Sequence, residues 1–153
     1  MRRLIVFLAV LTAACGENTP ATEPAPESLA GTWVLLSVNG ERLPTKIGTV
    51  AAFDIHWRMR MDSLFLSENG AVRRWTQVED STNFNGVWSK GTDNVTDSGT
   101  YVRKGNSVTI QLNRADAVVT GFVDGTGMTL PMPGCANVAG CSVGPLTFLF
   151  AKR

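Results

Sequence analysis

Asp54 and His56 stand two residues apart, and residues two apart on a β-strand share one face. A carboxylate that orients an imidazole can create a general base, so this pair is a candidate catalytic site. His56 is the only histidine, and no Gly-x-Ser-x-Gly elbow, phosphate-binding glycine loop or histidine-pair metal motif occurs. We interpret the pair as the polar face of a strand. The enzymatic alternative is a carboxylate pair among the 13 acidic residues. We expect no enzymatic activity, metal or cofactor.

Tryptophans are candidates for a binding site. Trp57, Trp75 and Trp88, together with Trp33, can line a ligand cavity, because indoles are large, rigid and apolar and carry one donor each. The alternative is that they fill a closed interior. Which of the two applies depends on the elements that position them.

Residues 29–153 have the pattern of an all-β domain. Short β-type runs alternate with glycine and asparagine turns, and no helical periodicity of useful length occurs. The run 32–38 stops at Asn39-Gly40, a pair suited to a type I′ hairpin turn. Further strands are expected within 64–67, 71–78, 100–103, 107–112, 118–122, 128–130 and 146–150.

About eight to ten strands joined by tight turns predict an antiparallel up-and-down meander. A meander of this length must hide its edges, either by closing into a barrel or by pairing as two sheets. Residues 43–62 are long and irregular, and they leave the strand count and register open.

The first 15 residues are a targeting segment. Arg2 and Arg3 precede an unbroken apolar run at residues 4–11, which is shorter than the about 20 residues of a spanning helix. Residues 11–15, LTAAC, resemble the lipobox of bacterial lipoprotein signal peptides. The resemblance implies a signal peptide at 1–14 and a lipid on Cys15. The alternative is an ordinary secretory signal.

Residues 15–28 are then the lipidated cysteine and a tether. Residues 16–28 hold three prolines, three glutamates and no large apolar residue, so they cannot bury a core. Fully extended, this segment spans roughly 40 Å. In the sorting pattern that accompanies the lipobox, Gly16 favours the outer membrane, with the domain facing the periplasm or the cell exterior.

The composition indicates one neutral, folded domain. The chain has 153 residues, of which 44% are hydrophobic and 18% charged, so most of it is not disordered. The formal charge is +1, and removal of Arg2 and Arg3 would leave 12 basic against 13 acidic residues, or −1. Such a balance gives no electrostatic footprint for nucleic acid or for an anionic membrane surface.

The triplet GTW at residues 31–33 opens the first expected strand, where lipocalins carry Gly-x-Trp. Together with SGTY at 98–101 and FLFAKR at 148–153, it resembles small bacterial lipocalin-like lipoproteins over residues 29–153. The resemblance implies a lipocalin-like β-barrel.

The same resemblance implies a structural barrel base made of Gly31, Trp33 and Arg153. In lipocalins a basic residue near the chain end packs over the tryptophan as a cation–π contact. Arg153 or Lys152 stands in that place.

Under the lipoprotein resemblance, Cys135 and Cys141 are the cysteines that remain. Beyond the inner membrane this pair is expected to form a disulfide, and closing so short a loop would stabilise the fold by only about 2 kcal/mol. A redox pair would have a CxxC spacing, and a metal site would need more nitrogen or sulfur ligands.

These patterns predict a lipid-anchored envelope lipoprotein with a non-enzymatic lipocalin-like domain. If its barrel is hollow, it binds a small apolar or amphipathic ligand. The alternative is an interaction or structural module with a filled barrel. A cavity lined by tryptophans favours the first, and a filled lumen beside an exposed apolar patch favours the second.

Overall fold

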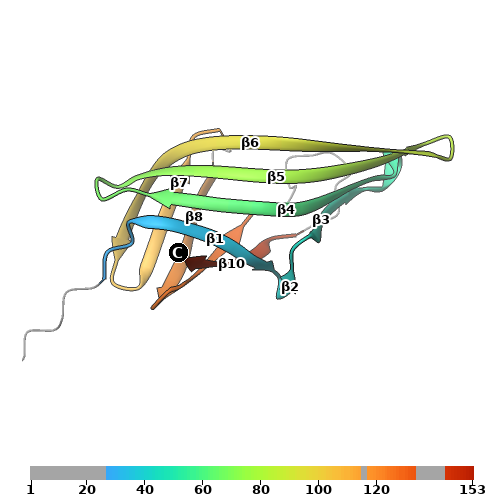
Figure 1. The fold of residues 1–153 in the computed structure, drawn as a ribbon. Coiled ribbons are helices and arrows are strands. Elements are labelled where there is room, and N and C mark those ends of the chain that lie inside the picture. Colours follow the sequence, from blue (N-terminus) through green and yellow to red (C-terminus); the bar gives the residue numbers. More distant parts are fainter. Residues whose placement is uncertain (1–26, 115–116, 134–143) are drawn as a thin grey trace, which may run out of the picture.

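The computed structural model describes residues 27–114, 117–133 and 144–153, which form an almost wholly β structure (Figure 1). The strands are β1 (Gly31–Val38), β2 (Glu41–Arg42), β3 (Thr45–Val50), β4 (Ile55–Leu66), β5 (Ala71–Phe84), β6 (Val87–Lys104), β7 (Ser107–Leu112), β8 (Ala117–Asp124), β9 (Gly127–Met132) and β10 (Leu146–Lys152). A 3-10 turn, η1 (Ala51–Phe53), precedes β4. None of the helical segments described is long and apolar enough to cross a bilayer.

Eight of these strands form a closed antiparallel barrel. The hydrogen-bonded order β1-β10-β9-β8-β7-β6-β5-β4 follows the chain, and pairing of β1 with β4 closes the ring, with Gly31 opposite Leu66. Every ring strand thus lies beside its neighbours in sequence. The predicted up-and-down meander closed into a barrel is confirmed, and β2 and β3 are the two strands outside the ring.

Residues 43–62 form β3, η1 and the first part of β4. Before them, β2 folds back on β1 through Asn39-Gly40, where φ is 52° and 82°. Positive φ at both positions is what a type I′ turn requires. In β4 a bulge between Met59 and Met61 changes which residues face the interior.

The barrel interior is filled by apolar side chains. Along β7 the inward residues Val108, Ile110 and Leu112 are at most 1% exposed, and the residues between them face outward. The same alternation continues in β8, β9 and β10, and the inward side chains form one connected core. Because residues 27–153 contain the closed ring and its core, a chain starting at residue 27 is expected to fold by itself.

Two glycines allow neighbouring strands to approach closely. A Cβ at Gly99 would lie 1.8 Å from the carbonyl oxygen of Gln111, and one at Gly121 would lie 2.0 Å from that of Thr129. Since no side chain fits at either position, glycine is needed where β6 meets β7 and where β8 meets β9.

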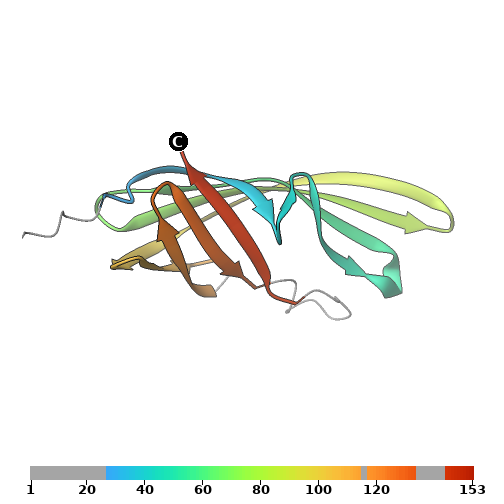
Figure 2. The ribbon, with the colours of Figure 1, turned by 90° about the horizontal axis from the view of Figure 1, so that it is seen from below.

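β4, β5 and β6 continue beyond the ring as an arm (Figures 1 and 2). The ring contacts of β4 with β1 cover residues 63–66, and those of β6 with β7 cover residues 99–104. The pairing of β5 with β6 continues further, to Phe84 opposite Val87. The runs expected at 71–78 and 100–103 are therefore parts of much longer strands. We call residues 45–61 and 77–95 the arm. The tip of the arm lies at the other end of the molecule from the start of β1 (Figure 1).

Candidate functional site

The lumen of the barrel contains a buried ion pair among its apolar side chains. The carboxylate of Asp62, which is 1% exposed, accepts hydrogen bonds from Arg74 Nε at 3.0 and 3.1 Å, from Arg74 Nη2 at 2.5 Å and from Thr76 Oγ1 at 3.2 Å. The Arg74 guanidinium also lies over the ring of Phe148, 5.9 Å from its centroid. Side chains and this network occupy the place where a hollow lipocalin would hold a ligand.

Trp33 belongs to the buried core of the barrel. Its side chain is fully buried, and its Nε1 donates a hydrogen bond to the Leu29 carbonyl oxygen at 2.9 Å. Lys152 pairs with Trp33 across β1 and β10, and Lys152 Nζ donates to the carbonyl of Ser28 at 2.7 Å. The side chain of Lys152 also lies against Gly31, where a Cβ would be 3.2 Å from Lys152 Cε.

Arg153 is exposed, and its backbone N–H donates to the carbonyl of Thr32 at 2.9 Å. Lys152, rather than Arg153, is the basic residue opposite Trp33 in the strand register. The cation–π role expected of Arg153 stays a prediction.

The other tryptophans lie in three different environments. Trp57 is partly buried in the arm portion of β4. Trp75 lines a groove on the barrel, whereas Trp88 is 51% exposed and lines a separate pocket on the arm. These candidates therefore do not converge on one cavity, and the sequence had no means of showing this.

Asp54 and His56 do meet, although Asp54 lies outside the strand. Asp54 has left-handed backbone angles at the end of η1, and its Oδ1 lies 3.1 Å from His56 Nε2. His56 Nδ1 is 3.5 Å from Thr49 Oγ1, which is long for a hydrogen bond. Asn83 Nδ2 donates to the other Asp54 carboxylate oxygen at 2.9 Å. The cluster joins η1 to β5, and we interpret it as a structural hydrogen-bond network that holds these two segments of the arm together.

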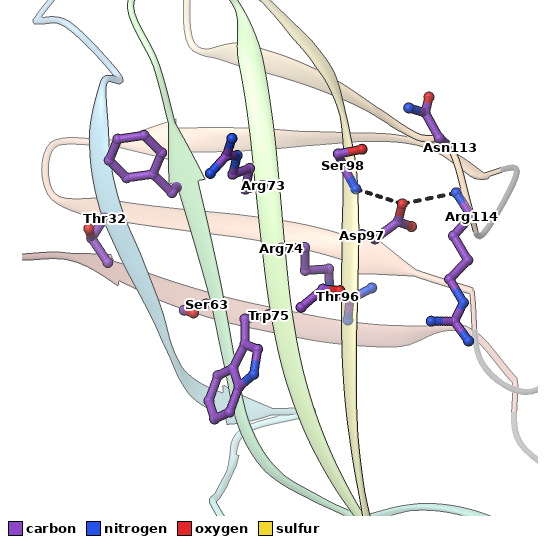
Figure 3. Close-up of a pocket in the computed structure, with 11 residues that line it drawn as sticks. Thr32, Ser63, Arg73, Arg74, Trp75, Thr96, Asp97, Ser98, Asn113 and Arg114 are labelled. Atoms are coloured by element: carbon purple, nitrogen blue, oxygen red, sulfur yellow. Dashed lines mark hydrogen bonds between the residues drawn. The ribbon is translucent and has the colours of Figure 1, made fainter.

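The groove on the outer face of the barrel crosses β1, β4, β5 and β6 (Figure 3). Strand register builds it from two neighbouring rows of outward side chains. In one row Phe65 lies opposite Arg73, and in the next Ser63 lies opposite Trp75. Because Ser63 is small, space remains between the two aromatic side chains. The groove has a volume of about 740 Å³, within the range of small-molecule sites.

Two arginines give the groove a positive rim. Arg73 comes from β5, and Arg114 follows β7 (Figure 3). Neither takes part in the ion pairs found among the described residues, which join His56 to Asp54, Arg60 to Glu79 and Arg74 to Asp62. The groove therefore combines aromatic surface with two cations outside these pairs, and its lining also includes Arg74, which is bound to Asp62, and the carboxylate of Asp97.

Asp97 holds the Arg114 side of the groove in place. Its Oδ1 accepts hydrogen bonds from the backbone N–H of Ser98 at 2.7 Å and of Arg114 at 2.9 Å (Figure 3). The backbone N–H of Asn113 also donates to the Ser98 carbonyl at 2.9 Å. These bonds fix the segment after β7 against β6, so Arg114 is positioned by β6.

The fold and the groove define an eight-stranded, up-and-down β-barrel with a filled interior and an amphipathic outer site. No protein-family model matches the chain, and no curated protein matches it. Cys15, Cys135 and Cys141 lie outside the described residues. Lipidation of the first and the disulfide between the other two stay predictions.

Proposed function

We propose that this chain is a lipid-anchored lipoprotein of the bacterial envelope with a lipocalin-like, non-enzymatic binding domain. Its ligand is a small amphipathic molecule with an anionic head, and it binds in the outer groove rather than in the lumen. The observation that carries this proposal is the pairing of Phe65 and Trp75 with Arg73 and Arg114 around one concavity of about 740 Å³.

The filled lumen supports an external site. A ligand in the lumen would have to displace buried side chains and the hydrogen-bonded Asp62–Arg74 pair. Displacing the apolar side chains would lose packing energy, and displacing one member of the ion pair would leave a buried charge unpaired. The outer groove leaves the core side chains in place. One of its lining residues, Arg74, belongs to the buried pair and stays bound to Asp62.

The chemistry of the groove defines the ligand class. The indole of Trp75 and the ring of Phe65 offer apolar contact area for an aliphatic or aromatic tail. The guanidinium groups of Arg73 and Arg114 suit a carboxylate, which they can contact through charge-assisted hydrogen bonds.

A second candidate function is protein interaction through the same face. Leu36 and Met61 are exposed large apolar side chains on β1 and β4, and Phe65 adds to them at the groove. An exposed apolar patch beside a filled barrel is typical of an interaction surface. In that case an apolar segment of a partner protein would occupy the groove.

Dodecanoate binding to residues 27–153 tests the ligand proposal. We expect saturable binding by calorimetry, and a double variant Arg73→Gln, Arg114→Gln should bind about tenfold more weakly or worse, because two charge-assisted contacts are lost. Trp75→Ala should weaken binding as well, through loss of the apolar contact. A matched control, Arg42→Gln with Lys104→Gln, removes two exposed cations elsewhere and should bind as the wild type does.

Two results would contradict the outer site. One is an affinity for dodecanoate that the groove variants leave unchanged. The other is the absence of saturable binding in the wild type, which would favour the protein-interaction candidate.

Lipidation is tested separately, by mass spectrometry of protein extracted from membranes. We expect an N-terminus at Cys15 carrying acyl chains, because several chains on one residue anchor a protein firmly where a single chain does not. Cys15→Ser should lose the lipid, whereas Cys135→Ser should keep it. An intact Met1, or a cleaved N-terminus without lipid, would refute the anchor.

A further inference from the structure

A second pocket, on the outer face of the arm, gathers basic side chains from strands far apart in the sequence. Its volume is about 350 Å³, and its lining includes Lys46 of β3, Arg58 of β4 and Lys90 of β6. We infer that this pocket is a binding site for a phosphate group, held by these three cations. The inference is independent of the barrel groove.

Strand pairing brings the three cations to one face. Lys46 lies opposite Arg58, and Arg58 lies opposite Glu79 of β5. Lys90 lies opposite Ser81, two residues along β5 from Glu79 and therefore on the same face. Lys46 and Arg58 thus enter the pocket from one side and Lys90 from the other. Between them Ser81 is short, which leaves space for an anion and offers a hydroxyl.

The acidic residue in the pocket already has a partner. Glu79 forms an ion pair with Arg60. None of the ion pairs found within residues 27–114, 117–133 and 144–153 includes Lys46, Arg58 or Lys90. Three positive charges around one space repel each other, and the attraction of a bound anion to each of them would offset this repulsion.

Two further acidic residues of the arm lie on its opposite face, whereas Asp54, beside the pocket, is bound to His56 and Asn83. Asp80 pairs with Gly91, and Asp93 pairs with Val78; both positions alternate with those that line the pocket. Strand alternation therefore separates charge between the two faces. This explains how a chain with a net charge of +1 can carry a strongly basic site.

An exposed aromatic wall adjoins the cations. The indole of Trp88 stacks on His56, with ring centroids 5.6 Å apart and an angle of 24° between the rings. Nearby, at the tip of the arm, Phe84 is 76% exposed and Val87 is 70% exposed. A ligand that carries a phosphate beside an apolar portion would match both features.

Phosphate fits these donors better than a carboxylate does. It carries up to two negative charges and several acceptor oxygens in a compact group, so Lys46, Arg58 and Lys90 can all contact it at once. Such a group can come from a phospholipid headgroup or from a soluble phosphate ester. Both sources share this chemistry, and the experiment separates them.

The test uses residues 27–153 with two probes, pyrophosphate in calorimetry and vesicles of phosphatidylglycerol and phosphatidylcholine in sedimentation. A triple variant, Lys46→Gln, Arg58→Gln, Lys90→Gln, is expected to bind about a hundredfold more weakly, since each cation near an anionic surface contributes roughly a fivefold gain. Arg58→Lys should bind nearly as the wild type does. Arg42→Gln with Lys104→Gln serves as a control that removes two exposed cations outside the pocket, and circular dichroism verifies folding of every variant.

Binding of pyrophosphate that the triple variant loses would support the site and identify a soluble ligand. Binding to phosphatidylglycerol vesicles, but not to pure phosphatidylcholine, with the same loss would support the site and identify a lipid. The inference is overturned if the wild type binds neither probe, if the triple variant binds as the wild type does, or if poly-glutamate binds and phosphate does not.

Discussion

Replacing Trp33 by alanine is expected to lower the free energy of unfolding by about 3–5 kcal/mol. Trp33 is fully buried in the core, so its removal leaves a cavity among side chains that can collapse only in part. The change also removes the hydrogen bond from Trp33 Nε1 and leaves the carbonyl oxygen of Leu29, itself a buried residue, without that donor. For a domain of ordinary stability this is a large part of the total.

Thermal melts of residues 27–153 measure this effect, with an expected fall in Tm of roughly 10–20 °C. Trp33→Phe should be much milder, because it keeps a ring in the core. Trp88→Ala removes the same side chain from an exposed position and should change stability little. An unchanged melting temperature in Trp33→Ala would overturn the structural role of this residue.

The strands of the ring could be predicted because they are buried on one face. In β7 the alternation of Val108, Ile110 and Leu112 with polar residues follows directly from that burial. Asn39-Gly40 predicted its turn correctly. Asparagine and glycine tolerate positive φ angles better than other residues, and both adopt such angles here. Both signals depend only on residues close together in the sequence, so they can be recognised without knowledge of the fold.

The arm could not be predicted from hydropathy. Residues 79–95 are mostly polar, because they extend beyond the ring and none of them belongs to the hydrophobic core, so no alternation is needed. One local signal was available and was missed. Asn85-Gly86 has φ values of 52° and 82° and turns β5 into β6 in the same way as Asn39-Gly40.

The two candidate sites depend on register, which the sequence does not show. Phe65 faces Arg73, and Lys46 faces Arg58, only because particular strands pair in a particular alignment. The bulge between Met59 and Met61 also shifts the inward positions of β4. A strict period of two starting from Met59 would direct Asp62 outward, whereas the structure buries it.

The buried Asp62 makes Arg74→Met the second severe substitution. Burial raises the pKa of the Asp62 carboxyl, and the Arg74 guanidinium is the main group that opposes this rise. Without Arg74 the carboxylate would be left in the core with only hydrogen bonds from Thr76 and from the backbone of Ser63 to stabilise its charge. Breaking a buried pair in this way typically costs about 3–5 kcal/mol, and we expect a loss of that size at about pH 7.

The sign of the pH dependence follows from the raised pKa. In Arg74→Met the folded state binds a proton on Asp62 more tightly than the unfolded state does, so lowering the pH through the folded-state pKa favours folding. The difference in unfolding free energy between the wild type and this variant should therefore be smaller at about pH 4 than at about pH 7. Urea unfolding at both pH values measures it.

The double variant Asp62→Leu, Arg74→Met separates the ion pair from its packing. Because the raised pKa indicates that desolvation of Asp62 outweighs its attraction to Arg74, removing both charges should return most of the stability lost in Arg74→Met. We expect the double variant to unfold within about 2 kcal/mol of the wild type. A double variant less stable than Arg74→Met, or an Arg74→Met protein as stable as the wild type at about pH 7, would show that the Arg74 guanidinium does not compensate a buried charge.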